Sequence, residues 1–167
     1  MAQFFAIHPD NPQDRLIKQA ADIVRSGGVI VYPTDSCYAL GCKLGDKNAM
    51  ERILTIRKID QKHHLTLMCA DLSELGTYAK VDNAQFRQLK AATPGSYTFI
   101  LQATKEVPNR TLHPKRKTIG LRVPDNATAL ALLQELGEPI LSCTLMLPED
   151  DEPLTDPYEI RDRLEHA

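Results

Sequence analysis

Residues 27–36 read GGVIVYPTDS and contain the clearest strand and loop signals of the chain. Its centre, residues 28–32, is a continuous apolar run, which predicts a strand covered on both faces. Pro33 ends the strand, and small polar residues follow at once. Loops at strand ends collect ligands in α/β sheets, where Thr34 and Ser36 can donate hydroxyls and Asp35 can accept. The same three residues also suit an ordinary capped turn, and both interpretations stay open.

Helical and strand-like segments alternate on either side of this stretch. Asn11 and Pro12 predict the start of a helix that Gly27 ends. In the helix that follows Asp82, Phe86 is expected to face the core. Further helices are predicted to start at Asp46, Asp71, Asp125 and Asp156. Strand-like runs lie at residues 37–42, 65–69, 97–102, 117–123 and 140–145. This alternation predicts an α/β (α+β) fold with a mixed β-sheet and flanking helices, in one domain over residues 1–167.

Composition and charge narrow the possible partners. The chain has 167 residues, 43% hydrophobic and 25% charged, which is typical of a globular domain and excludes disorder. Its apolar runs are too short to span a bilayer, so no membrane partner is expected. The net charge is −2, but residues 105–122 carry six Lys or Arg against one Glu. Residues 149–167 carry eight Asp or Glu against two Arg. This asymmetry indicates a face for an anionic partner and an acidic end, or else an ordinary solvated surface.

No metal site is predicted from the sequence. The cysteines lack the spacing of a zinc site, and the pair His63 and His64 lacks a third ligand at a sensible spacing. Reduced, buried thiols and a polar N-terminal segment predict a cytoplasmic protein. The cysteines are Cys37, Cys42, Cys69 and Cys143.

Two arginines stand at the ends of predicted elements. Arg57, with Lys58 beside it, ends the helix that Asp46 starts. Arg57 can have a purely structural role, because the helix dipole favours a cation at the C-terminal end of a helix. Its alternative role is to contact a phosphate, which suits the planar guanidinium. Arg122 lies in an apolar strand and needs a partner, either a protein carboxylate or an anionic substrate.

Three motifs together resemble the signatures of the YrdC-like family. They are residues 27–36, residues 94–101 with the sequence PGSYTFIL, and residues 118–124 with the sequence TIGLRVP. Residues 46–52 and 65–72, together with Asn11 and Pro12, are similar to the YciO-type branch in particular. The resemblance implies a YrdC-like fold, in which a twisted mixed sheet has a concave basic cleft.

The resemblance also implies an activity and partners. Proteins of this family make threonylcarbamoyl-AMP from L-threonine, bicarbonate and ATP with Mg²⁺, and release pyrophosphate. The product serves the threonylcarbamoyladenosine modification of tRNA, and the family further implies binding of tRNA or double-stranded RNA. Two anions must meet in this reaction, so cationic and hydroxyl groups are expected to line the site.

Site residues follow from the same resemblance. We expect Arg57 to hold phosphate, Arg122 to hold the threonine carboxylate and Thr34 to bind threonine. The expected catalytic residues are Arg57 and Thr144. The expected substrate-binding residues are Thr34, Ser36, Tyr38, Thr118 and Arg122. The expected nucleotide- or RNA-binding residues are Arg57, Lys58, Lys115, Arg116 and Lys117.

The sequence departs from the family pattern at functional positions. Thr55 stands where the family has the lysine of a Lys-x-Arg pair, and Met146 replaces the amide of a Ser-x-Asn pair. The family's C-terminal β segment is not expected within these 167 residues. The activity is therefore expected to be weak, and the alternative is a non-catalytic paralogue that binds double-stranded RNA or tRNA. A monomer or a weak dimer is expected.

Overall fold

A computed structural model describes residues 1–60, 62–63 and 65–167, so His64 of the predicted histidine pair lies outside the described residues. The described helices are α1 (Asp14–Arg25), α2 (Lys47–Arg57), α3 (Leu72–Tyr78), α4 (Asn83–Ala92), α5 (Ala127–Leu136) and α6 (Pro157–Leu164), with one 3₁₀ turn at Asn109–Thr111. The described strands are β1 (Ile30–Tyr32), β2 (Ala39–Lys43), β3 (Thr66–Met68), β4 (Phe99–Gln102), β5 (Thr118–Arg122) and β6 (Ile140–Thr144).

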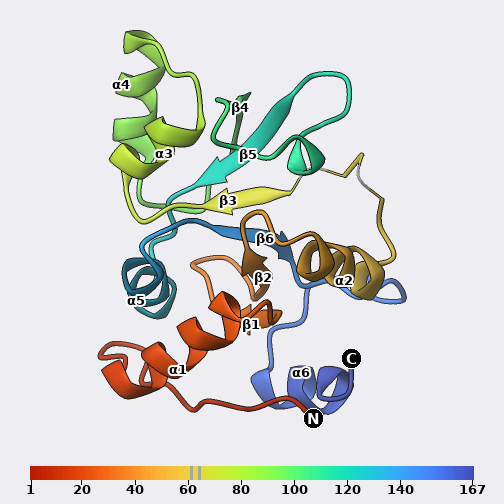
Figure 1. Cartoon of the computed structure of the whole chain (residues 1–167). Coiled ribbons are helices and arrows are strands. Elements are labelled where there is room, and N and C mark those ends of the chain that lie inside the picture. The colour runs from red at the N-terminus through yellow and green to blue at the C-terminus, as the bar shows by residue number, and fades with distance from the viewer. Residues whose placement is uncertain (61, 64) are drawn as a thin grey trace.

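The strands form one mixed sheet in the order β1-β2-β6-β3-β5-β4, which confirms the predicted α/β class (Figure 1). Only β3 and β5 run parallel, and every other neighbouring pair is antiparallel. The pairing places segments far apart in sequence beside each other, because β6 inserts between β2 and β3. The concave basic cleft implied by the family stays a prediction.

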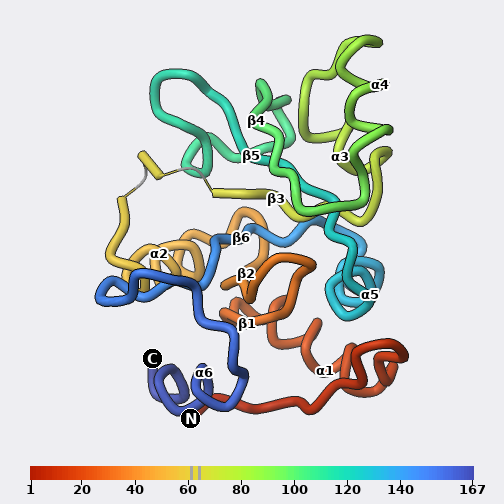
Figure 2. Tube along the Cα trace, turned by 180° about the vertical axis from the view of Figure 1, so that it is seen from behind, coloured from red at the N-terminus to blue at the C-terminus, as the bar shows by residue number. Residues whose placement is uncertain are grey.

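Alternation along the strands divides the core between the two faces of the sheet. One face carries Leu121 and Leu141 and packs against α2. The other face carries Met68 and Ile140 and packs against α1 and α5. Figures 1 and 2 show α2 on one side of the sheet, apart from α1 and α5. The sheet therefore separates two core clusters, and polar side chains at the ends of its strands belong to one face or the other.

A predicted helix start is confirmed where the side chain of the first residue accepts a hydrogen bond from a backbone N–H in the first turn of the helix. Asp46 and Asp82 accept from Ala49 and Gln85, respectively. Two boundaries were wrong. The first helix begins after Gln13, because the His8 ring accepts the N–H groups of Asp10 and Asn11 and holds that segment in a turn.

The second wrong boundary concerns the helix predicted to start at Asp125. Asn126 is the N-cap of α5 and accepts from the Ala129 N–H at 3.0 Å. The N–H of Asp125 is instead directed to the side chain of Asp35. The cap of α5 is therefore local, but it lies one residue later than the sequence predicted.

The chain ends lie side by side at one end of the molecule, as Figures 1 and 2 both show. The Ala2 N–H donates to the Glu165 carbonyl at 2.8 Å. Next to this contact, Phe4 stacks on Tyr158 of α6 with ring centroids 5.6 Å apart. These contacts attach the N-terminal arm to α6.

Candidate functional site

The loop after β1 folds around the hydroxyl of Thr34. Its Oγ1 accepts the N–H groups of Ser36 and Cys37, each at 3.2 Å, and donates to the Cys37 carbonyl. The side chain of Ser36 is exposed and lies 3.2 Å from the same oxygen. The capped-turn interpretation is therefore confirmed for Thr34, whose hydroxyl already makes hydrogen bonds within the loop.

Asp35 joins this loop to the end of β5. Its Oδ1 forms an ion pair with the guanidinium of Arg122, and its Oδ2 accepts the Asp125 N–H at 3.1 Å. The Arg122 side chain is 8% exposed and that of Asp35 is 15% exposed. Arg122 therefore has a protein carboxylate as its partner, which is one of the two partners that the sequence allowed.

Two of the three guanidinium nitrogens of Arg122 make hydrogen bonds within the protein. Its Nε donates to the Gly95 carbonyl at 3.2 Å, and its Nη2 donates to Asp35. The Nη1 makes no hydrogen bond with a described residue, yet no buried polar side-chain atom among them lacks a partner. The Nη1 must therefore reach solvent, and it is the atom of Arg122 that can meet a ligand.

Arg57 ends α2 and packs against the end of β6. Its Nε donates to the Met146 carbonyl at 3.1 Å, and its Nη1 donates to the sulfur of Cys143 at 2.8 Å. The residue is 8% exposed, and no carboxylate of the described residues pairs with it. Its Nη2 makes no hydrogen bond there and, by the same reasoning as for Arg122, reaches solvent. A buried cation without an internal anion is a suitable contact for an anionic ligand.

The thiol of Cys143 is a neutral partner for this guanidinium. Burial raises the pKa of the Cys143 thiol, and the hydrogen bond and charge of Arg57 only partly oppose that shift. The thiol therefore carries a proton at neutral pH, and the charge of Arg57 stays uncompensated. Cys143 was not among the predicted site residues, although its position directly before Thr144 could have suggested a role.

The two arginines lie on opposite faces of the sheet. Cys143 belongs to the face that α2 covers, whereas Arg122 is in register with Met68 and Ile140 on the face of α1 and α5. Alternate residues of a strand point to opposite faces, so the partners of Arg57 and Arg122 are separated by the sheet itself. A ligand that meets both arginines must pass around the rim of the sheet.

Thr144, the other expected catalytic residue, lies in the chain between the two residues that Arg57 contacts, Cys143 and Met146. Its side chain takes the opposite face from Cys143, because alternate residues of a strand point to opposite faces. Thr144 is exposed at the end of β6, opposite Ala39 of β2. Met146 contributes its carbonyl oxygen to the site. Thr55 is exposed and donates to the Glu51 carbonyl at 2.8 Å, so its hydroxyl is used within α2. Thr55, which stands at the position of the family's lysine, therefore lies on a different face of α2 from the buried Arg57.

A second pair of hydroxyls is buried on the face of Arg122. Tyr32 of β1 and Ser142 of β6 share a hydrogen bond across the intervening strand β2. Burial raises the pKa of Tyr32, with smaller lowering effects from Ser142 and Arg122. The Tyr32 hydroxyl therefore stays protonated and serves as a structural donor or acceptor.

The remaining predicted residues are more scattered. Thr118 is buried at the opposite end of β5 from Arg122, about 13 Å away at the usual rise of a strand. Lys58 is exposed just after Arg57 and has a left-handed backbone with a φ of 53°. Lys115, Arg116 and Lys117 are exposed in the loop between β4 and β5.

Tyr38 faces a different space. It lines a cavity of about 770 Å³ between β1, the N-terminal arm, α1 and α6. Burial raises the pKa of its hydroxyl, and the carboxylate of Asp156 raises it further. The structure therefore brings Thr34, Ser36 and Arg122 together. It leaves the Thr144 side chain on the opposite face of β6 from the contact of Arg57 with Cys143, and it places Tyr38 and Thr118 apart from both arginines.

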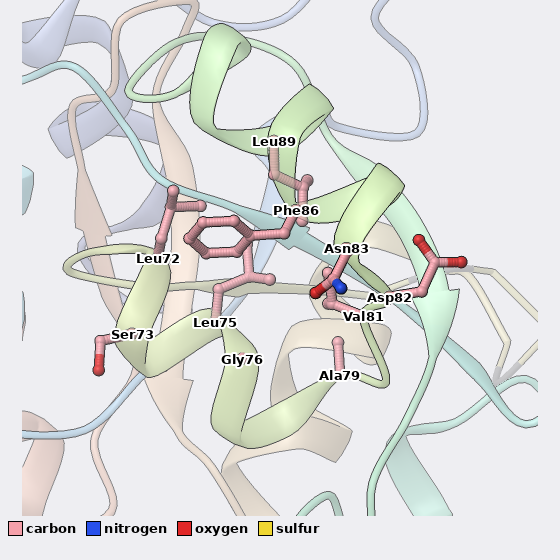
Figure 3. Close-up of a pocket in the computed structure, with 10 residues that line it drawn as sticks. All are labelled: Leu72, Ser73, Leu75, Gly76, Ala79, Val81, Asp82, Asn83, Phe86 and Leu89. Atoms are coloured by element: carbon pink, nitrogen blue, oxygen red, sulfur yellow. The ribbon is translucent and has the colours of Figure 1, made fainter.

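A smaller hollow of about 280 Å³ lies between α3 and α4 (Figure 3). Its lining mixes apolar and polar side chains and contains none of the predicted site residues. Phe86 lines it and is 46% exposed, so the prediction that Phe86 faces the core was wrong. Leu89 is the buried residue of α4, so this helix contacts the core through a narrow face that does not include Phe86.

Metal-binding groups and membrane-spanning helices are absent from residues 1–60, 62–63 and 65–167. No group of three His, Cys, Asp or Glu side chains among them could hold a metal ion. In the same part of the chain, no helix has the length and apolarity needed to cross a membrane.

Comparison with known sequences identifies relatives over nearly the whole chain. A family model for Sua5, YciO and YrdC proteins, described as "Telomere recombination", matches residues 22–167. The protein YciO of Escherichia coli K12 is 67% identical over 99% of this chain and 80% of its own length. A threonylcarbamoyl-AMP synthase of Chromobacterium violaceum is 36% identical over 80% of this chain and 69% of its own length.

Solved structures give the same assignment. The crystal structure of E. coli YciO superposes with a TM-score of 0.96 at 66% identity, covering 99% of this chain and 81% of that one. P. abyssi Sua5 complexed with L-threonine matches with a TM-score of 0.82 at 24% identity, covering 91% of this chain and 44% of that one, which shows a common fold. The expected resemblance is confirmed, and the chain belongs to the Sua5/YciO/YrdC family.

Proposed function

We propose that this protein is a weak threonylcarbamoyl-AMP synthase, which acts on L-threonine, bicarbonate and ATP. The observation that carries the proposal is Arg57, a buried guanidinium without a carboxylate partner whose Nη2 reaches solvent. The 36% identity to a threonylcarbamoyl-AMP synthase supports the same reaction.

The residues suit a reaction between anions. The threonine amine and bicarbonate give an N-carboxy group with loss of water, and its oxygen then attacks the α-phosphorus of ATP while pyrophosphate leaves. Arg57 would contact the phosphates and neutralise charge that develops during this displacement. Arg122, through its Nη1, would hold the threonine carboxylate near the exposed Ser36. Mg²⁺ would enter bound to ATP, because the triphosphate itself supplies oxygen ligands.

We expect purified protein to release pyrophosphate slowly from ATP, and only when L-threonine and bicarbonate are both present. The measurement is pyrophosphate release from radiolabelled ATP with Mg²⁺, with either substrate omitted as a control. Release that is equal without threonine or without bicarbonate would show ordinary ATP hydrolysis. No release above the protein-free background would contradict the proposed function.

RNA binding is a second candidate function, favoured by Lys115, Arg116 and Lys117. They are consecutive, exposed and far from the carboxylates of the acidic end in sequence. Neutralising phosphates with such side chains releases counterions, so binding of tRNA or double-stranded RNA should weaken steeply with salt. This function does not depend on Arg57 and can coexist with a weak synthase.

We expect the logarithm of the RNA association constant to fall linearly with the logarithm of salt concentration. A triple variant, Lys115→Gln, Arg116→Gln and Lys117→Asn, should reduce that slope by about 2 to 3. Asparagine is chosen because the backbone of Lys117 has a φ of 56°, which asparagine tolerates. Fluorescence anisotropy of labelled RNA gives both slopes, and an unchanged slope in the triple variant would exclude this loop as the RNA contact.

A further inference from the structure

The Arg122 side chain is long and flexible, so its contacts with neighbouring groups determine the direction of its guanidinium. Two of its three guanidinium nitrogens are engaged, Nε by the Gly95 carbonyl and Nη2 by Asp35. The third nitrogen, Nη1, reaches solvent. The partners that fix the side chain therefore also determine which nitrogen a ligand can meet.

Asp35 is itself fixed by a second contact. Its Oδ2 accepts the Asp125 N–H at 3.1 Å, just before α5, while Oδ1 faces Arg122. In addition, the Asn126 amide lies 3.4 Å from the Thr34 carbonyl. The carboxylate thus connects the loop of Thr34 and Ser36, the end of β5 and the beginning of α5. A side chain without charge at position 35 would form a weaker hydrogen bond with Arg122, so the direction of the guanidinium would no longer be fixed.

We propose that Asp35 is a positioning residue for substrate binding, which holds Arg122 so that its Nη1 receives the carboxylate of L-threonine. This inference rests on the proposed function for the identity of the ligand. The Asp35–Arg122 pair is neutral as a whole, so it offers a directed hydrogen bond rather than a net charge. Binding of the amino-acid carboxylate should consequently depend on the direction of the guanidinium, which Asp35 fixes.

Asp35→Asn is the direct test, because asparagine keeps the size of the side chain and removes its charge. We expect the dissociation constant for L-threonine, measured by titration calorimetry on the whole chain, to rise at least about tenfold. The dissociation constant for ATP with Mg²⁺ should change less than about twofold, because Arg57 lies on the other face of the sheet. Asp35→Glu should recover part of the threonine affinity, because it restores the carboxylate.

Asp162→Asn is the matched control, since it makes the same chemical change at a side chain that is 72% exposed. It should bind both ligands as the unmodified protein does. Circular dichroism at the titration temperature establishes that each variant is folded. If Asp35→Asn does not fold, the comparison passes to Asp35→Glu, for which threonine affinity should fall while ATP affinity is retained.

Several outcomes would overturn the inference. Unchanged threonine affinity in a folded Asp35 variant would show that the carboxylate does not position the ligand contact. An equal loss of threonine and ATP affinity would show a structural role only. If the unmodified protein bound no L-threonine, L-threonine would not be the ligand of Arg122. Threonine binding without pyrophosphate release would instead contradict the proposed synthase while leaving the role of Asp35 supported.

Discussion

Replacing Arg122 with methionine is expected to lower the free energy of unfolding by about 3 to 5 kcal/mol. The change leaves the Asp35 carboxylate, which is 15% exposed, without its cation, and an unpaired charge in such a position is strongly unfavourable. It also removes the hydrogen bond to Gly95. Urea unfolding followed by circular dichroism measures the loss.

Arg163→Met is the control for this prediction. Arg163 lies within ion-pair distance of Glu149, Asp150 and Glu159, so a count of salt bridges would rank it above Arg122. Its side chain is 28% exposed, and two of its partners, Glu149 and Glu159, are 66% and 53% exposed and remain hydrated when it is removed. We expect a much smaller loss than for Arg122→Met. The reverse order would contradict the argument that burial sets the contribution of these pairs.

A double variant separates charge from packing. Asp35→Asn together with Arg122→Gln removes both charges and keeps groups that can form hydrogen bonds. It should be less destabilised than Arg122→Met, because no charge is left unpaired. Equal destabilisation of the two proteins would instead assign the effect to the lost side-chain volume of Arg122.

Replacing Arg57 with alanine is expected to reduce threonine- and bicarbonate-dependent pyrophosphate release by about 100- to 1000-fold. The guanidinium is the buried cation at the end of β6 that no described carboxylate neutralises. Arg57→Lys keeps the charge, but one ammonium cannot hold both Cys143 and Met146 in the same planar geometry, so an intermediate loss is expected. The same radiolabelled assay measures these rates.

Arg52→Ala is the matched control on the same helix. Arg52 is exposed, and its contact is with the Ala167 carbonyl at 3.2 Å. It should retain the rate of the unmodified protein. If Arg57→Ala kept the full rate of pyrophosphate release, Arg57 would not contribute to the reaction, and the proposed function would lose its main support.

Much of the fold could be predicted because its signals are local. Asp46 and Asp82 cap their helices through N–H groups three residues away, and Gly137 ends α5 with a left-handed φ of 71°. The apolar run before Pro33 became a strand, although β1 is shorter than predicted and lies at the edge of the sheet. These features need only neighbours along the chain.

The candidate site was predictable only in its residue types. The sequence indicated that Arg122 needs an anion, but the anion is Asp35, which lies 87 residues earlier. Likewise, Arg57 meets Cys143 across 86 residues. Neither contact has a local signal, because both depend on the order of strands in the sheet.

The elements, the family motifs and the excess of cations in residues 105–122 follow from the amino-acid sequence alone. The folded sheet places Arg57 and Arg122 on opposite faces, and it brings the N–H of Asp125 to the carboxylate of Asp35. The physical reason is that caps and apolar periodicity act within a few residues, whereas the partner of a buried charge is chosen by which strands pair and which face each residue takes.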